Sequence, residues 1–375
     1  MNYSESSTFD ISNKTLSPLQ WAEKACETLM AKFDPEQLPP ERFHYHQGVF
    51  LSGMEKCWRL TKKDQYFEYI KRWVDSHVLD DGTVTKLKAD ELDDIQPGVL
   101  LFNLYEQTGD ERYKKALYNI VPLLKTLKKN PSGGFWHKEH YENQMWLDGL
   151  YMGGPVAVQF AHTFGESEYA DMITQQALLL EKHTKDPETG LLYHGWDETK
   201  VAPWADPITG TAPEFWGRAI GWVPVGLLEI FDSLPEDHKD KEALTQTLQN
   251  LTLALTNYQD SDTGLWYQVI DKGHLADNWL ETSCSCLFVQ AIAKAVRLGY
   301  LDEKYLDYAW KGYQGVIDTL KFDKDGNVII GNICIGTGIG DYAHYIARPT
   351  SENDLHGAGA FILMCVEMSQ AREVE

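Results

Sequence analysis

Hydrophobic residues recur every three or four positions along most of the chain, which is the spacing of an amphipathic helix. About twelve windows carry this pattern, and each is long enough for a stable packed helix. They are residues 18–33, 48–62, 65–79, 91–108, 111–128, 144–163, 167–183, 214–232, 240–257, 280–298, 303–319 and 355–371. Strand-like patterns are short and fall between the windows. The chain is therefore predicted to be all-α.

Two short signals alternate with these windows and give the chain a weak internal repeat. One is a polar turn followed by a tyrosine, as in residues 165–169, where acidic residues suit the first turn of a helix. The other is a glycine that precedes an extended apolar stretch, with copies at Gly82, Gly134, Gly190, Gly264 and Gly326. Consecutive copies lie 52 to 74 residues apart, which fits one helical hairpin plus a loop. We predict a closed ring of six hairpins, an (α/α)6 barrel, with an open helical solenoid as the alternative.

No linker or low-complexity segment interrupts the pattern, which predicts one domain over residues 1–375 with a flexible N-terminal extension at residues 1–15. The inner helices should be apolar and glycine-rich, as in residues 144–163. The outer helices should carry lysine and glutamate, as in residues 111–128. The start of the chain lacks the features of a signal peptide, and no apolar run approaches the length of a membrane span. We expect a cytoplasmic monomer or weak oligomer.

Composition narrows the classes of partner. The formal charge is −22, from 56 acidic and 34 basic residues, so the chain repels phosphate backbones and anionic membranes. We expect neither nucleic acid nor membrane as a partner, whereas an anionic small molecule requires a locally basic pocket. The 12 tryptophans suggest aromatic-lined binding surfaces. The six cysteines form no CxxC pair and are predicted to be buried free thiols.

Residues 133–155 carry the strongest signal of chemistry. One carboxylate, Asp148, lies there in an apolar and aromatic run. Burial of an ionised carboxylate is costly, so such an acid stays protonated or finds a partner. A carboxyl group with a raised pKa can donate a proton near neutral pH. Asp148 is therefore a candidate general acid/base, and the alternative is a helix-associated aspartate paired with backbone or arginine.

A second candidate acid, Asp93, lies in the acidic stretch 90–94 before an apolar window. On local sequence alone, acidic residues at a helix start are the favoured explanation of the stretch. Asp93 and Asp148 occupy comparable places in two hairpins, so a closed ring would bring both to one rim. Asp94 stands beside Asp93, so the choice between the two rests on register.

Histidines and one arginine complete the candidate site. The histidines are His44, His46, His137, His140 and His194. No HExxH motif or carboxylate spacing accompanies them, so we expect no metal and no cofactor, and predict hydrogen bonds to hydroxyl groups or a carboxylate. Arg218 lies between Trp216 and Trp222. Cation–π packing in the core and binding of a substrate carboxylate explain this arginine equally well.

The candidate residues lie in a series of segments whose sequences and order resemble those of the unsaturated rhamnogalacturonyl hydrolases, glycoside hydrolase family 105. The resemblance covers nearly the whole chain, through residues 44–51, 90–96, 133–138, 144–153, 193–198, 213–218, 277–281 and 353–360. It implies an (α/α)6 barrel, which agrees with the fold expected from the repeat. It also implies a substrate that a lyase has already cut, so that its non-reducing sugar is a 4,5-unsaturated uronic acid.

The family resemblance further implies hydration of the sugar's double bond. Asp148 would protonate C4, water would add at C5, and the resulting hemiketal would open and release the next sugar. Asp93 would orient the water or a sugar hydroxyl. Substrate-binding roles are expected for His46, His137, Trp146, His194, Trp216, Arg218 and Trp222. The alternatives are an unsaturated glucuronyl hydrolase acting on glycosaminoglycan fragments and a non-catalytic carbohydrate-binding barrel.

Overall fold

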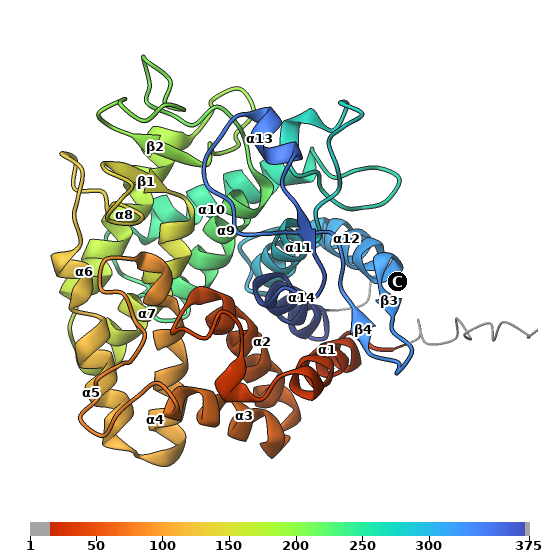
Figure 1. The fold of residues 1–375 in the computed structure, drawn as a ribbon. Coiled ribbons are helices and arrows are strands. Elements are labelled where there is room, and N and C mark those ends of the chain that lie inside the picture. Colours follow the sequence, from red (N-terminus) through yellow and green to blue (C-terminus); the bar gives the residue numbers. More distant parts are fainter. Residues whose placement is uncertain (1–15, 372–375) are drawn as a thin grey trace, which may run out of the picture.

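The computed structural model describes residues 16–371, so the expected extension at residues 1–15 lies outside the described part. The chain runs once around a ring of helices (Figure 1), from α1 (Pro18–Lys32, red) to α14 (Leu355–Met368, blue). At the end of this path α14 packs against both α1 and α2 (Tyr45–Thr61). The first and last helices of the ring are therefore neighbours.

Six helices form the inner ring. They are α2, α4 (Val99–Thr108), α7 (Asp148–Phe164), α9 (Gly217–Phe231), α11 (Thr282–Arg297) and α14. Each contacts the next in this order, and α14 contacts α2. This contact closes the ring, which confirms the predicted barrel and excludes the open solenoid.

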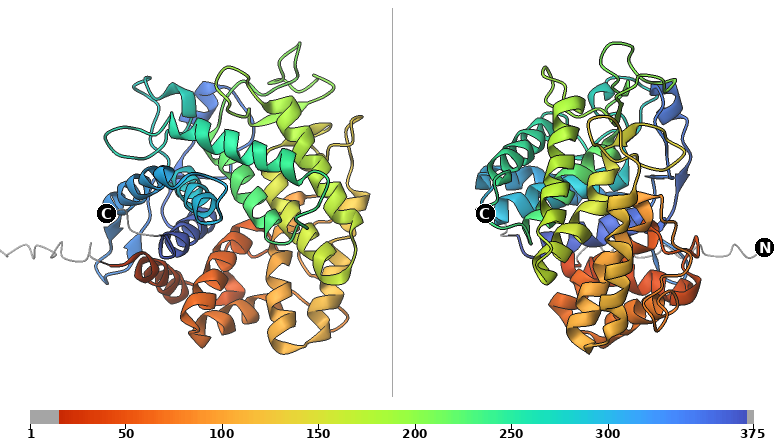
Figure 2. Two further views of the ribbon diagram at one scale, coloured as in Figure 1. Left: turned by 180° about the vertical axis from the view of Figure 1, so that it is seen from behind. Right: turned by 90° about the vertical axis from the view of Figure 1, so that its left-hand side faces the viewer.

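Further helices flank the inner ring from outside, as the views from behind and from the side show (Figure 2). Within residues 16–371 there are six of them. They are α1, α3 (Asp64–Asp75), α5 (Glu111–Ile120), α8 (Glu168–Thr184), α10 (Lys241–Thr256) and α12 (Leu306–Thr319). Each packs on an inner helix, and α1 packs on α14. The remaining helical pieces are short: α6 (Leu123–Thr126), α13 (Tyr342–Ile346), η2 (Pro35–Gln37), η3 (Leu92–Asp94), η4 (Gln96–Gly98), η5 (Ile270–Lys272) and η6 (Glu303–Tyr305).

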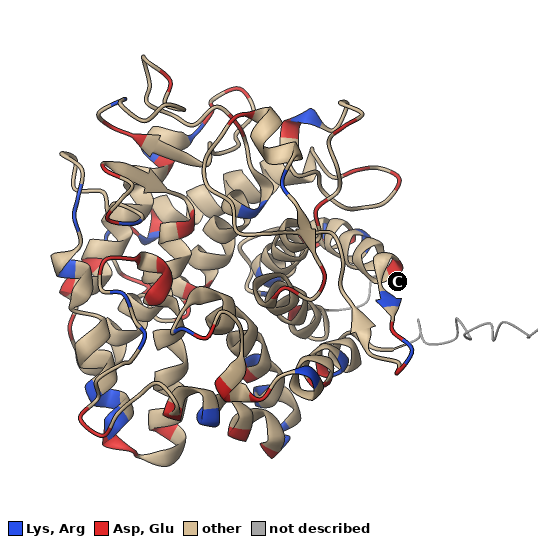
Figure 3. Ribbon diagram, viewed as in Figure 1, with Lys and Arg blue, Asp and Glu red and all other residues tan. Residues whose placement is uncertain are grey.

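Most outer helices carry more charged residues than most inner ones, the tendency that the sequence predicted (Figure 3). The inner helix α14 contains one charged residue, Glu367, and every one of its residues is buried. The outer helix α3 has charged residues on its exposed side and buries a stripe that includes Ile70, Trp73 and Val74. Burial of apolar side chains is the main favourable term in folding, so this division places the core between and inside the rings. All six cysteines are free and buried, as predicted.

Three two-stranded antiparallel sheets lie in the loops. They pair β1 (Gln144–Trp146) with β2 (Gly195–Asp197), β3 (Lys321–Phe322) with β4 (Val328–Ile329), and β5 (Ile333–Cys334) with β6 (Thr350–Ser351). The first sheet joins the loops before α7 and α9 and thereby fixes the segment that leads into Asp148. Within residues 16–371, no helix combines the length and apolarity needed to cross a membrane.

Two predicted helical windows begin differently in the structure. The window at residues 144–163 starts as strand β1, and its helix begins only at Asp148. The window at 91–108 starts with the short turns η3 and η4 before α4 begins at Val99. Pro97 accounts for the second difference, because proline lacks an N–H donor and disfavours the helical conformation of the residue before it.

Helices α2 and α14 approach so closely that only glycine fits at Gly359. A Cβ atom there would lie 2.6 Å from the backbone of Val49 and Phe50. We expect Gly359→Ala to force the helices apart and to lower the free energy of unfolding by about 1–3 kcal/mol, measured by denaturant titration. Gly331→Ala is the control, since a methyl group there meets nothing within 4 Å. Equal stability of the two variants would contradict this packing.

Candidate active site

A pocket of about 220 Å³ opens among the loops at one end of the ring. Its walls come from the start of α2, from η3, from residues 137–152, from the start of α9 and from the segment 336–338. The predicted site residues in its lining are His46, Asp93, His137, Trp146, Asp148, Trp216 and Arg218. Residues from widely separated hairpins therefore meet at one rim, as the repeat predicted.

Asp148 is the first residue of α7 and exposes 14% of its side chain. Its Oδ2 atom lies 3.3 Å from Nε2 of His194, whose side chain is fully buried. The two atoms are not aligned for a hydrogen bond, and neither has a hydrogen-bond partner among the described residues. The positive end of the helix dipole also favours a carboxylate at this position. His194 does not line the pocket, so it acts on the site through Asp148.

The expected raised pKa of Asp148 is wrong for the unliganded protein. Burial raises the pKa of this carboxyl group, but the adjacent His194 imidazole outweighs it and holds the pKa below its ordinary value. Burial lowers the pKa of His194. At neutral pH the pair therefore consists of an ionised Asp148 and a neutral His194. The sequence showed the apolar surroundings but not the histidine that comes from 46 residues later.

Asp93 lies in η3 and exposes 6% of its side chain. Its Oδ2 is 2.7 Å from Nζ of Lys138, and its Oδ1 is 3.4 Å from Nε2 of His137. Burial raises the pKa of Asp93, but His137 and Lys138 more than offset this and hold it well below its ordinary value. Asp93 is therefore a permanent carboxylate that can accept a hydrogen bond or stabilise positive charge but cannot supply a proton.

The neighbouring Asp94 points away from the pocket and is fully buried. Its carboxylate accepts hydrogen bonds from Arg42 at 2.6 and 2.7 Å and from the backbone N–H of Lys88 at 2.7 Å. Nδ1 of His44 lies 2.6 Å from the same carboxylate. These contacts tie the start of α2 to η3. Of the two adjacent acids, Asp93 lines the pocket and Asp94 holds the wall together.

Stacked rings form one side of the pocket. Trp146 lies parallel to His137, with centroids 4.6 Å apart, and to Tyr141, with centroids 4.5 Å apart. Flat faces of this kind bind the apolar side of a sugar ring. Tyr141 also lines the pocket but was not predicted, because in the sequence it is one aromatic residue among many. Strand β1, which contains Trp146, begins three residues later.

Arg218 lines the pocket, and other groups of the protein already bind its guanidinium group. It stacks on Trp216 at 4.5 Å from the ring centroid and donates hydrogen bonds to the carbonyl groups of Cys334 at 2.5 Å and Ile335 at 2.8 Å. Of the two explanations left open by the sequence, these contacts support packing. Arg218 holds the segment that forms the opposite wall.

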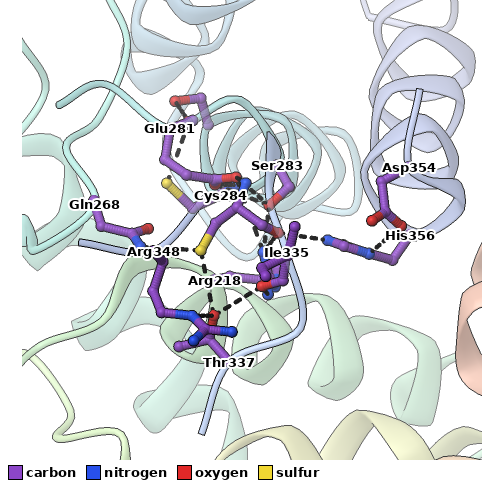
Figure 4. A network of polar contacts seen from close by, with 12 residues as sticks. Arg218, Gln268, Glu281, Ser283, Cys284, Ile335, Thr337, Arg348, Asp354 and His356 are labelled. Carbon is purple, nitrogen blue, oxygen red and sulfur yellow. Dashed lines mark hydrogen bonds and ion pairs between the residues drawn. The ribbon is translucent and has the colours of Figure 1, made fainter. Parts of the chain in front are cut away.

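A buried network fixes this wall (Figure 4). The Glu281 carboxylate caps α11 by accepting from the backbone N–H of Cys284 at 2.6 Å, and it also accepts from the N–H of Cys334 at 2.8 Å. Arg348 donates to the Thr337 hydroxyl group at 3.0 Å. The segment that contains Cys334 and Thr337 is therefore tied to two helices and a loop, and the pocket wall is preorganised.

Two predicted binding residues differ in their placement. Nε2 of His46 lines the pocket and lies 3.9 Å from Oδ1 of Asp354. Trp222 is buried, stacks on Tyr151 at 4.6 Å and does not line the pocket. Packing on α9 explains Trp222, so we do not include it among the binding residues. His46, Asp354 and His356 are close enough to share a cation, and the expected absence of a metal stays a prediction.

Comparison with known proteins places this geometry in context. The Glycosyl Hydrolase Family 88 model matches residues 21–372. The unsaturated rhamnogalacturonyl hydrolase YesR of Bacillus subtilis strain 168 is 25% identical over 300 residues, which cover 78% of this chain and 79% of that protein.

Solved structures share the fold. A family 105 glycoside hydrolase from C. acetobutylicum ATCC 824 superposes with a TM-score of 0.89 at 36% identity, covering 93% of this chain and 99% of that one. The unsaturated glucuronyl hydrolase of Bacillus sp. GL1 superposes with a TM-score of 0.69 at 16% identity, covering 93% and 95% of the two chains. The second likeness concerns the fold alone.

Proposed function

Because the chain belongs to glycosyl hydrolase family 88, with a family 105 hydrolase among its near relatives, we propose that it releases a 4,5-unsaturated galacturonic acid from lyase-generated rhamnogalacturonan oligosaccharides. Membership makes the chain a glycosidase of the unsaturated uronyl hydrolase class. The proposed substrate is that of the Bacillus subtilis relative, an unsaturated rhamnogalacturonyl hydrolase. The observation that carries the proposal is Asp148, poised between a buried histidine and an aromatic pocket.

The proposed reaction uses Asp148 first as an acid and then as a base. Its proton goes to C4 of the enol ether, and the positive charge that develops at C5 is shared with the ring oxygen. A water molecule adds at C5 and returns a proton to Asp148. The resulting hemiketal opens to a ketone at C5, and the hemiacetal left at C1 releases the next sugar. The rule that relates carboxylate separation to anomeric outcome therefore does not apply.

The fixed charge on Asp93 suits the second role. Lys138 and His137 keep this carboxylate ionised, so it can accept a hydrogen bond from the attacking water or from a sugar hydroxyl group. A preorganised negative charge also stabilises positive charge at C5 in the transition state. Two carboxylates in one pocket thus have different roles, because their neighbours differ.

Binding of the substrate favours the protonated form of Asp148 that the reaction needs. The uronate carboxylate is attached to C5, next to the carbon that Asp148 protonates. A second negative charge beside Asp148 raises its pKa, and exclusion of water by the sugar ring acts in the same direction. The anionic substrate therefore promotes protonation of its own general acid.

The activity can be tested directly. The protein is incubated with an unsaturated rhamnogalacturonan disaccharide, and loss of the ultraviolet absorbance of the C4=C5 bond is followed with release of rhamnose. Turnover of this disaccharide supports the proposal. Activity only on unsaturated glycosaminoglycan disaccharides would replace the substrate and keep the mechanism. Binding without turnover of either class would favour a non-catalytic barrel.

The pH dependence follows from the lowered pKa of Asp148. In the free protein the protonated acid is a minority species at neutral pH, so kcat/KM is expected to rise as pH falls from roughly 8 to 5. The decline of kcat with rising pH should occur at a higher pH than that of kcat/KM, because the bound carboxylate raises the pKa of Asp148. Initial rates across the range test this. An increase of kcat/KM with rising pH would contradict an acid role for Asp148.

A further inference from the structure

A tyrosine from the other end of the chain lies behind the Asp148–His194 pair. Tyr345 belongs to the short helix α13 and is fully buried. Its hydroxyl oxygen lies 2.7 Å from Nδ1 of His194, the ring nitrogen that faces away from Asp148. The backbone N–H of Gly340 donates to the same oxygen at 3.4 Å. Tyr345 does not line the pocket, so it can reach the chemistry only through His194.

The direction of the Tyr345–His194 hydrogen bond follows from the available donors and acceptors. The Tyr345 oxygen already accepts from Gly340. Among the described residues, the one acceptor within hydrogen-bond distance of its proton is Nδ1 of His194. A neutral imidazole carries one proton, and a nitrogen that accepts a hydrogen bond does not hold it. The proton of His194 is therefore on Nε2, which faces Oδ2 of Asp148 at 3.3 Å.

We propose that Tyr345 is a positioning residue that selects the Nε2–H tautomer of His194 and so keeps the imidazole proton on the nitrogen that lies 3.3 Å from Asp148. This inference rests on the proposed function only for its kinetic consequence. In the other tautomer, a lone pair of His194 would face the carboxylate of Asp148. Repulsion between them would turn the Asp148 side chain away from the position that the reaction needs. Selection of one tautomer by a partner on the far nitrogen is the usual way that proteins set the role of a histidine.

The surroundings hold Tyr345 in place for this task. Trp216 packs against both rings, with centroids 4.7 Å from His194 and 5.7 Å from Tyr345. The backbone carbonyl group of Tyr345 accepts a hydrogen bond from Nε2 of Gln268 at 3.1 Å. Trp216 is thus stacked on Tyr345 and tilted against His194, and Tyr345 is anchored at its backbone. Loss of the hydroxyl group alone should leave the packing intact.

The first experiment needs no substrate. Nitrogen-15 NMR of the imidazole groups reports which ring nitrogen is protonated, and the His194 signals are assigned by their loss in His194→Gln. We expect a protonated Nε2 in the wild-type protein and a mixture of tautomers in Tyr345→Phe. Tyr342→Phe is the matched control, because it removes a hydroxyl group from the same helix, where that group bonds to Asp277 at 2.7 Å. A protonated Nδ1 in the wild type, or an unchanged spectrum in Tyr345→Phe, overturns the proposal.

The second experiment separates positioning from general stability. Tyr345→Phe is expected to lower kcat about tenfold with little change in KM, a fraction of what the general acid itself contributes. In the Asp148→Asn background the same change should cost nothing further, since the group it positions is already gone. An equal loss in both backgrounds overturns the proposal. Inactivity of the wild-type protein on the unsaturated disaccharide overturns the proposed function instead, and the NMR result then stands alone.

Discussion

Asp148→Asn is expected to lower kcat by at least about 100-fold, because the amide cannot transfer a proton to carbon. The replacement has nearly the same shape, and the buried His194 tolerates an amide oxygen where the carboxylate oxygen lies, 3.3 Å from Nε2. The helix that begins at this residue should therefore be unchanged. Substrate binding should be kept or strengthened, since a negative charge next to the uronate is removed. The measurement is steady-state kinetics with the unsaturated disaccharide, together with a binding titration.

Asp171→Asn serves as the control for Asp148→Asn. Asp171 lies on the outer helix α8, where it pairs with Lys239, and the same change there removes one carboxylate without touching the pocket. Its kcat should equal that of the wild type. Near wild-type activity of Asp148→Asn would reject Asp148 as the general acid, whatever the substrate. Loss of binding in that variant, with the fold intact by circular dichroism, would show that the carboxylate holds the sugar.

Asp93→Asn is expected to lower kcat by about 100-fold, the usual cost of removing one preorganised stabilising group. The carboxylate is buried and paired with Lys138, so its replacement leaves that lysine with Glu91, at 3.5 Å, as its remaining ion-pair partner. That cation can pair with the substrate carboxylate instead. KM should therefore change less than kcat. Initial rates and thermal unfolding of the purified variant give both quantities.

The adjacent Asp94 supplies the contrast for Asp93→Asn. Asp94→Asn breaks hydrogen bonds to Arg42 and places an amide donor against other donors, so about 1–3 kcal/mol of stability should be lost. Its kcat per folded molecule should stay much closer to that of the wild type. The two variants, at adjacent positions, thus distinguish a catalytic role from a structural one. The opposite result, an inactive Asp94→Asn beside an active Asp93→Asn, would make Asp94 the second acid of the site in place of Asp93.

The fold was predictable because its determinants are local. Twelve amphipathic windows and a repeated glycine signal specify hairpins, and the division of charge between residues 111–128 and 144–163 specifies which helices face inward. The starts of helices were less predictable, because they depend on single residues such as Pro97. Helix α13 was missed, since five residues are too few to show a period.

The site was predictable in its members more than in their roles. Asp148 stands out in the sequence because its apolar surroundings are unusual for an acid, whereas Asp93 is indicated by its place in the repeat and by the family resemblance. Their ionisation depends on His194 and Lys138, whose positions relative to the acids only the folded chain defines. Arg218 shows the same limit, because its partners are the carbonyl groups of Cys334 and Ile335, more than a hundred residues away. Local sequence carries no information about such contacts.

Closure of the ring by α14 has a consequence for synthesis of the chain. The apolar side of α2 is covered by a helix that begins only at Leu355, close to the end of the sequence. A growing chain emerges from the ribosome at about 5–20 residues per second, so α2 waits some tens of seconds for its partner. Until then the incomplete barrel exposes apolar surface of the kind that chaperones bind. Chains that terminate early should consequently aggregate or be degraded, rather than accumulate as partly active fragments.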